Sequence, residues 1–340
     1  MQQKDWSKTK VHTGWKYAMA FPRLPAKAAY IHLNNPKKRN ALSLSVLQDL
    51  RTQLHRHLTS PRTGRLLLLP SFNPHTIKLL RSHNDANSDN SDSPSKWLTD
   101  SAAWRRDREG LPNVLVLRSE GPAFSAGHDL VELQRASDDE VKKTFALCAE
   151  VMMLIRRSPA PVVCPVQGLA TAAGFQLAMT ADYPIALGST MFQLPGMRIG
   201  LPCTSPATAV SRRLPAALAY RLFATGESIS AGELGAGVLD VVPVPEHAES
   251  TDTAAVAFEA RVEAVVSRLA EETAGQPQAF GKWAYWAQLA VDNRDEGDFM
   301  DDYEAASRWA GGVMAMHAQS EDANEGINAW KEKRKPEWKT

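Results

Sequence analysis

The sequence predicts an α/β fold that begins with alternating strands and helices. Short apolar runs at 28–33, 114–119 and 161–168 have the length and composition of strands, and the last two read as continuously buried. Between these runs lie stretches of helical periodicity at about 44–57 and 141–157. Strands that alternate with helices favour a parallel sheet covered by helices.

The chain divides into three parts by pattern. Residues 1–25 form an N-terminal extension with several lysines, no apolar signal-peptide core and only weak similarity to a mitochondrial presequence. Residues 26–245 form the α/β core, in which Ser43 is expected to cap the first helix. Residues 246–340 form a helical C-terminal region. Its long helices are expected at about 251–273, 278–291, 298–318 and 322–333.

Residues 59–110 differ from the rest of the core. The polar tract at 83–95 is of low complexity, and the apolar run before it is cut by Pro70. Because long loops are uncommon inside compact domains, we expect a disordered or irregular surface insertion that carries no chemistry. Translated intron sequence is an alternative origin for this stretch.

Composition excludes several classes of protein. The chain has 340 residues, 44% of them hydrophobic, and a formal net charge of +1, so no global field attracts nucleic acid or an anionic membrane. The three cysteines, Cys148, Cys164 and Cys203, have the spacing of neither a zinc site nor a disulfide framework. No apolar run approaches the roughly 20 residues of a membrane-spanning helix.

Two glycine-bearing segments are the candidates for chemistry. FSAGHDL (124–130) and GLATAAGFQLA (168–178) each place small residues where a strand ends and a helix begins. Small residues let a ligand approach the backbone, and a helix start offers free N–H groups. Two such amides that converge would hold an oxyanion. Tight turns and close helix packing explain the same residues, and spacing alone leaves phosphate, dinucleotide and thioester ligands open.

The order of these motifs resembles the enoyl-CoA hydratase/isomerase (crotonase) superfamily. The resemblance covers nearly the whole chain outside the first two dozen residues and the 59–110 insertion. The matching segments are NPKKRNALS (35–43), VLVLRSEGPAFSAGHDL (114–130), PVVCPVQGLATAAGFQLAMTADYPIAL (161–187), FQLPGMRIGL (192–201), LFATGESISAGEL (222–234), GVLDVVPVPE (237–246) and EGINAWKEKRKPEW (325–338). It implies a crotonase (ClpP-like) spiral of ββα units with a helical C-terminal trimerisation region.

The resemblance also implies a site for an acyl-CoA or enoyl-CoA thioester. The family's two oxyanion donors fall on the backbone N–H groups of His128 and Ala173. The CoA-binding positions of the family fall on several further residues of the two motifs, the early loop and a C-terminal helix. These are Lys37, Lys38, Arg39, Ala126, Asp129, Leu130, Val131, Gly174 and Lys282. No separate cofactor and no metal is implied, because CoA enters as part of the substrate.

The pattern departs from the family at its acid–base positions. The two glutamates of standard hydratases fall on Gln176 and Gly196, and the acid of dienoyl isomerases falls on Thr204. A positioned acid–base group contributes roughly 10²–10⁴-fold, so the standard reaction should be strongly impaired. His128, Asp129, Glu132 and Cys203 are weak substitutes.

Three functions therefore stay open. The first is a hydratase- or isomerase-type enzyme of fatty acid metabolism, a lyase or isomerase with an altered acid–base set. The second is a different crotonase reaction, such as thioester hydrolysis or decarboxylation. The third is a non-catalytic acyl-CoA-binding or assembly protein. The resemblance further implies a homotrimer or hexamer in mitochondria, with a cytoplasmic location as the alternative.

Overall fold

The computed structural model describes residues 21–82, 95–244, 251–291, 302–318 and 320–340. Its core is a parallel sheet of five strands in the order β1-β2-β3-β5-β8. These strands are β1 (Ala28–Leu33), β2 (Val114–Ser119), β3 (Val162–Val166), β5 (Tyr183–Leu187) and β8 (Asp240–Val242). A smaller sheet contains β4 (Leu169–Thr171), β6 (Met191–Gln193) and β7 (Ser228–Ser230).

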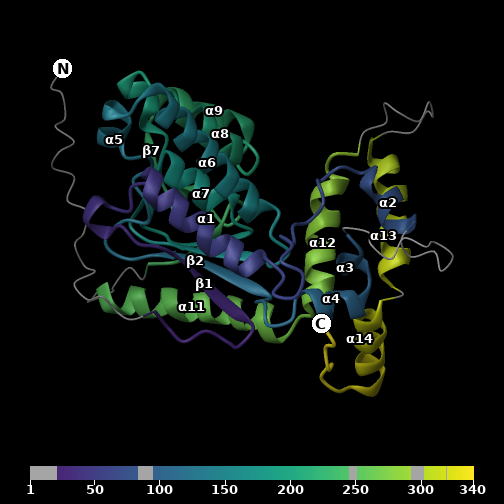
Figure 1. Ribbon diagram of the computed structural model, residues 1–340. Helices are drawn as coiled ribbons and strands as arrows, with labels where there is room; N and C mark the ends of the chain where they lie inside the picture. The colour runs from purple at the N-terminus through teal and green to yellow at the C-terminus, as the bar shows by residue number, and fades with distance from the viewer. Residues whose placement is uncertain (1–20, 83–94, 245–250, 292–301, 319) are drawn as a thin grey trace.

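Strand β2 shows how the sheet separates two hydrophobic cores. Leu115 and Leu117 belong to one core and Val114 and Val116 to another, because successive residues of a strand point to opposite faces. Helices cover both faces, which explains why the strand is buried at every position. They are α1 (Leu44–Leu58) and α6 (Asp138–Arg156) on one face and α11 (Thr251–Glu271) on the other (Figure 1).

The remaining helices of the core are short and surround the two sheets. They are η2 (Pro36–Lys38), α5 (Leu130–Arg135), α7 (Ala173–Thr180), η3 (Pro195–Ile199), α8 (Thr204–Val210), α9 (Ala216–Thr225) and α10 (Ala231–Leu234). Helix α7 is buried along its whole length, which agrees with its small and apolar residues. Within the described ranges, no helix is long and apolar enough to cross a bilayer.

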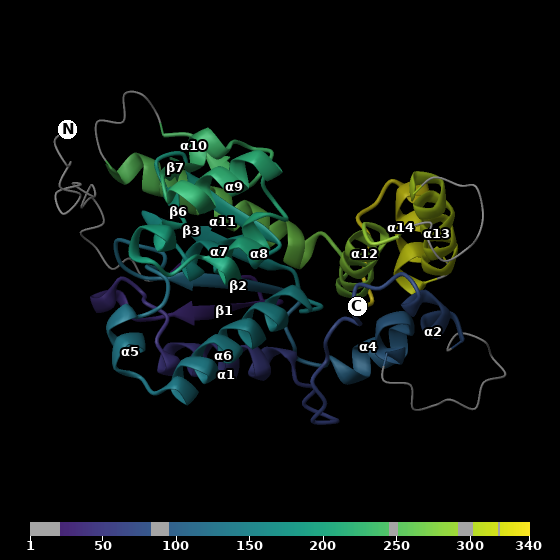
Figure 2. The same cartoon turned by 90° about the horizontal axis from the view of Figure 1, so that it is seen from above.

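A second, helical lobe stands beside the core (Figure 1, Figure 2). It combines helices from two distant parts of the chain. They are α2 (Thr76–Ser82), α3 (Lys96–Thr99), α4 (Ser101–Asp107), α12 (Gly275–Gln288), α13 (Asp302–His317) and α14 (Glu321–Glu332). Trp283 of α12 is fully buried, its ring centre lies 5.7 Å from those of Phe280 and Trp309, and its indole N–H donates to the Ser71 carbonyl.

The expectation that residues 59–110 do not pack was wrong for the described part of this stretch. It contributes eight buried side chains to the hydrophobic core of the lobe, together with Phe280 and Trp283. These are Leu67, Leu69, Ile77, Leu80, Trp97, Leu98, Ala103 and Trp104. The polar tract lies almost entirely outside the described residues. The stretch is therefore a structural part of the lobe, since its apolar residues are covered by helices that lie far along the chain.

The boundary at residue 246 also needs correction. Helix α11 belongs to the core, because Phe258, Val262 and Val266 pack against the sheet. The lobe begins only with α12. The expected positions of the four long C-terminal helices agree with α11 to α14 within four residues at each end. The prediction for residues 1–25 falls mostly outside the described residues.

Candidate functional site

The early basic loop lies against the first glycine-bearing loop. The amide of Ala126 donates to the Arg39 carbonyl at 2.9 Å, and the amide of Leu42 donates to the Gly127 carbonyl at 2.7 Å. Two sequence segments that were assigned to one site from the resemblance are thus joined by backbone hydrogen bonds.

Asn40 and Ser125 hold this junction together. Asn40 is fully buried and has a positive φ of 54°. Its side-chain amide donates to the backbone carbonyls of Glu120 and Ala123. The Ser125 hydroxyl donates to the Asn40 carbonyl at 2.8 Å and accepts from the Gly127 amide at 3.2 Å. Sequence reasoning did not single out either residue. The signal available for Asn40 was an asparagine next to a turn, a residue type that tolerates positive φ.

The second loop turns sharply at Ala172. This residue has φ 50° and ψ −119°, a backbone conformation that L-residues rarely adopt and that is typical of functional sites. Its amide donates to the Gln193 carbonyl at 2.9 Å, and the Thr171 amide donates to the Ser125 carbonyl at 3.0 Å. Helix α7 then starts at Ala173, so the unusual turn aims the helix start at the first loop.

The two loops touch through their glycines. A Cβ on Gly127 would lie 2.8 Å from the Thr171 carbonyl oxygen and 3.2 Å from the Ala173 nitrogen. A Cβ on Gly174 would lie 2.5 Å from the Ser125 carbonyl oxygen. A Cβ cannot lie closer than 3 Å to a carbonyl oxygen, so glycine is required at 127 and at 174 for the two loops to approach this closely. The backbone of residues 127–128 consequently lies directly beside the start of α7.

The backbone N–H groups of His128 and Ala173 are available as hydrogen-bond donors. Within the described part of the chain neither nitrogen donates to a protein acceptor. Ala173 is the first residue of α7, and the first N–H groups of a helix have no partner inside the helix. The two loops that contact each other therefore each carry one backbone N–H group without an acceptor among the described residues.

The side chain of His128 is enclosed. Its Nδ1 lies 3.3 Å from the Leu42 carbonyl, and its ring contacts the Phe145 ring at 4.9 Å between centres. Burial lowers the pKa of His128, so the imidazole is neutral at pH 7. Because the Leu42 oxygen accepts from Nδ1, Nε2 is left as the proton acceptor. Nε2 is buried and finds no partner among the described residues.

Gln176 lies one helical turn after Ala173 on α7, so both residues share a face. Its buried amide makes only long hydrogen bonds, at 3.3 Å and 3.4 Å, to the hydroxyls of Ser205 and Thr208 on α8. The described contacts of this side chain are thus with neutral groups. An amide in this place can orient a water molecule but cannot take its proton.

Gly196 has no room for a side chain. A Cβ there would lie 2.0 Å from the Leu201 carbonyl oxygen and 2.8 Å from the Cys203 sulfur. An acidic residue at this position would need a different course of the loop between η3 and α8. Cys203 itself is buried, and burial raises the pKa of its thiol. Cys203 therefore lacks the lowered pKa of a nucleophile. Thr204, at the third acid position, starts α8 and is exposed.

The residues expected along the CoA path lie beside the first loop. Asp129 caps α5 by accepting from the amides of Val131 and Glu132, and its carboxylate pairs with Lys38 at 2.7 Å. The Lys38 ammonium holds the pKa of Asp129 below its ordinary value. Lys38, Val131 and Glu132 line a groove of about 410 Å³. Leu130 and Val131 are half exposed, so apolar side chains are available to a ligand there.

Lys282 lies apart from these residues, and its expected role needs correction. Its ammonium is 2.6 Å from the Asp182 carboxylate, and only 7% of its side chain is exposed. The ion pair joins α12 to the core at the far end of α7. In this arrangement Lys282 is not open to the phosphates of a CoA molecule.

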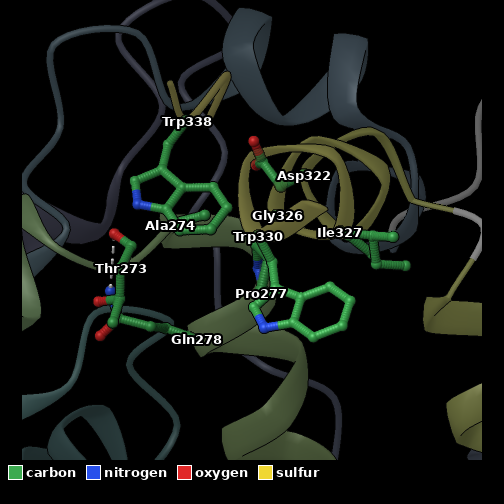
Figure 3. A pocket seen from close by; sticks show the side chains of 10 residues that line it. Thr273, Ala274, Pro277, Gln278, Asp322, Gly326, Ile327, Trp330 and Trp338 are labelled. Atoms are coloured by element: carbon green, nitrogen blue, oxygen red, sulfur yellow. Dashed lines mark hydrogen bonds between the residues drawn. The ribbon is translucent and has the colours of Figure 1, made fainter. Parts of the chain in front are cut away.

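A groove of about 570 Å³ lies in the helical lobe between α14 and the start of α12 (Figure 3). Its walls are mostly apolar and include Trp330, Trp338 and Pro277. None of the predicted site residues lines it. The candidate site is therefore the contact between the two glycine-bearing loops and not this groove.

Known proteins are similar to this chain over most of its length. The family model described as enoyl-CoA hydratase/isomerase matches residues 103–273, which include both loops. Proteins named enoyl-CoA hydratase domain-containing protein 3, mitochondrial, are similar over 91% of the chain: 33% identical to that of Mus musculus (80% of its length) and 32% to that of Homo sapiens (79%).

Solved structures give the same result. The crystal structure of human enoyl Coenzyme A hydratase domain-containing protein 3 matches with a TM-score of 0.65 and 30% identity, over 93% of this chain and 98% of that one. An enoyl-CoA hydratase of Mycobacterium smegmatis matches with a TM-score of 0.65 and 29% identity, over 94% and 98%. Both the fold class and the resemblance predicted from sequence are confirmed: the chain belongs to the enoyl-CoA hydratase/isomerase family.

Proposed function

We propose that the chain binds an acyl-CoA thioester and polarises its carbonyl oxygen between the backbone N–H groups of His128 and Ala173. The observation that carries the proposal is the direct backbone contact between Gly127 and the start of α7. The Ala173 amide also carries the partial positive charge of a helix start. Each such donor is worth about 2.7–4 kcal/mol of transition-state stabilisation.

Polarisation alone prepares two reactions. It makes the α-proton of the thioester more acidic, and it makes C3 of an enoyl group more electrophilic. We assign the orientation of water to Gln176 and proton transfer to the neutral imidazole of His128, because its Nε2 is an acceptor without a partner among the described residues. We propose a reaction of the hydratase or isomerase type with these groups in place of the two glutamates. It needs no cofactor beyond the CoA of the substrate.

The CoA moiety is proposed to run past the first loop toward the early basic loop. Lys37 and Arg39 are exposed there, and neither forms a side-chain hydrogen bond or ion pair with another described residue. Lys38 is only partly available, because it pairs with Asp129. Arginine and lysine supply the charge and donors that phosphates need.

A second candidate function is a non-catalytic acyl-CoA binder. The packing around Gly196 favours it, because this loop cannot accept an acidic side chain without moving. Thioester hydrolysis or decarboxylation is the remaining enzymatic alternative, since carbonyl polarisation supports both.

The test is incubation of purified protein with crotonyl-CoA and longer enoyl-CoAs while the absorbance of the conjugated thioester is followed. A fall in absorbance shows hydration of the enoyl group. A slower fall with Gln176→Ala or His128→Ala supports the roles proposed for these side chains. Binding by calorimetry without turnover supports the binder. No binding of any acyl-CoA rejects both.

Location and assembly are proposed from the relatives. The similar proteins of Mus musculus and Homo sapiens carry the word mitochondrial in their names, and we propose the same compartment for this chain. We also propose a homotrimer or hexamer, which light scattering of the purified protein tests. A monomeric mass would contradict the assembly without affecting the site.

A further inference from the structure

The carboxylate of Glu132, on α5, lies at the start of α1. It accepts a hydrogen bond from the Leu44 amide at 2.7 Å, although the two residues are 88 positions apart in the chain. Leu44 is the first residue of α1, and the first N–H groups of a helix have no partner inside the helix. The helix dipole also favours a negative charge at this end. Glu132 therefore helps to fix the segment that leads into α1.

The same segment holds the imidazole of His128. The carbonyl oxygen of Leu42 lies 3.3 Å from Nδ1 of His128, and the Leu42 amide donates to the Gly127 carbonyl at 2.7 Å. Leu42 and His128 also form an isolated parallel β-bridge. A carbonyl oxygen can only accept, so it selects the tautomer with the hydrogen on Nδ1 and leaves Nε2 as the acceptor. The tautomer of His128 thus depends on a segment that Glu132 helps to hold.

Glu132 carries a negative charge that no salt bridge offsets. Asp129 fixes the start of α5 by accepting from the Glu132 amide at 3.2 Å, and its carboxylate pairs with Lys38 at 2.7 Å. In the part of the chain that the structure describes, no cation lies within ion-pair distance of the Glu132 carboxylate. Glu132 is only partly exposed, so its charge is screened less than a charge on an open surface.

The charge of Glu132 acts on the His128 imidazole. Burial lowers the pKa of His128, whereas the Leu42 carbonyl and the negative charge of Glu132 raise it. The other elements around the imidazole offer no comparable charge. From α6 the uncharged Phe145 ring contacts the imidazole, and the charged residues before it on that helix are exposed, as is Arg135 at the end of α5. The first turn of α7 has no acidic or basic residue.

We propose that Glu132 is a positioning residue for His128, an inference that rests on the proposed function. It keeps segment 42–44 in place, so that Nδ1 retains its hydrogen, and its charge stabilises the imidazolium that forms during proton transfer. In that step the C–H bond at the α-carbon of the thioester breaks, and its electron pair enters the enolate held by the two backbone amides. The proton forms a new bond to Nε2 of His128. Glu132 itself exchanges no proton.

The experiment is an NMR titration of the full chain with ¹⁵N-labelled histidine rings, in which the spectrum of His128→Ala assigns the signal. In the wild type the ¹⁵N shifts of His128 should show the Nδ1–H tautomer. Glu132→Gln keeps an oxygen for the Leu44 amide but removes the charge, so its His128 should titrate at lower pH than in the wild type. Glu132→Asp keeps the charge but is shorter, so part of its His128 should change to the Nε2–H tautomer.

Glu233→Gln is the matched control. Glu233 also closes the start of a helix, because it accepts from the Ser230 amide at 2.8 Å in the capping box of α10, and it lies outside the two loops. Its replacement should leave the titration and the tautomer of His128 unchanged. The proposal is overturned if Glu132→Gln titrates like Glu233→Gln, or if Glu132→Asp keeps the wild-type tautomer alone.

A second measurement follows the proton-transfer step itself. The α-protons of a bound saturated acyl-CoA should exchange with solvent deuterium about tenfold more slowly in Glu132→Gln, at unchanged affinity. The rise of the exchange rate with pH should have its midpoint at lower pH than in the wild type. A lower rate and affinity with the wild-type midpoint would show a merely structural role and overturn the proposal. If no acyl-CoA binds, the proposed function fails, whereas the titration still decides the role of Glu132.

Discussion

Substitution of Gly127 by alanine tests the contact between the two loops. In the folded chain Gly127 has φ 79°, and an added Cβ would lie 2.8 Å from the Thr171 carbonyl oxygen and 2.9 Å from the Ala172 Cβ. Both neighbours belong to the turn that starts α7, so relief of the clash must push that turn away. The nearby Ala173 nitrogen, 3.2 Å from the same point, moves with it.

The expected magnitude has two parts. An alanine in the left-handed region costs roughly 1–2 kcal/mol wherever it occurs. Separation of the two amides removes one donor from the oxyanion, which costs about 2.7–4 kcal/mol or a factor of about 10²–10³. Gly64 has a similar φ of 68° with no atom within 4 Å of an added Cβ. Gly64→Ala should therefore lose the stability that an alanine in the left-handed region costs, but it should keep both oxyanion donors.

Acetoacetyl-CoA provides the assay, because its enolate absorbs differently from the ketone and forms without a catalytic carboxylate. The wild type and Gly64→Ala should bind it and increase its enolate absorbance equally. Gly127→Ala should lose at least tenfold in affinity and most of the absorbance change while remaining folded by circular dichroism. Equal behaviour of the two variants would refute the reasoning, because it would separate ligand binding from the loop contact.

Three other perturbations have defined outcomes. Gln176→Glu places a carboxylate beside the second loop and should raise crotonyl-CoA hydration on the order of 10²-fold; an unchanged rate with intact affinity would contradict the placement of this side chain. Trp283→Ala should destabilise the helical lobe by about 3–5 kcal/mol in urea unfolding, and an unchanged midpoint would mean that Leu69 and Trp104 do not share a stabilising core with α12. Asp129 has a folded pKa below its unfolded one because of Lys38, so its contribution is complete above the unfolded value and disappears as pH falls through the folded value. Unfolding of Asp129→Asn should therefore show a smaller loss of stability below about pH 4, and a slope equal to that of the wild type would exclude the ion pair as the cause.

Features set by neighbouring residues were predictable from the sequence. The bounds of β1 and β2 agree with the apolar runs, and Ser43 caps α1 through the amide of Val46, because these depend on a few adjacent residues. The glycine-bearing loops were found for the same reason. Their relative placement came from the resemblance, since no local pattern states that Gly127 touches the start of α7.

Features set by distant partners were not predictable. From the sequence, Trp97 and Trp104 belong to an irregular insertion. In the structure they share a hydrophobic core with Trp283 of α12, which lies far along the chain. A lysine such as Lys282 is expected on the surface of a helix. Its counter-charge, Asp182, lies outside the helix, so the sequence of the helix does not predict the buried ion pair. In both cases the deciding contact is tertiary.

Infrared difference spectroscopy of a bound acyl-CoA with a ¹³C-labelled carbonyl tests the central claim most directly. Two backbone donors on one oxygen weaken the C=O bond, so the account predicts a band at lower frequency than in solution, and a smaller shift in Gly127→Ala than in Gly64→Ala. A bound thioester whose carbonyl frequency equals that in water would contradict the pairing of the His128 and Ala173 amides.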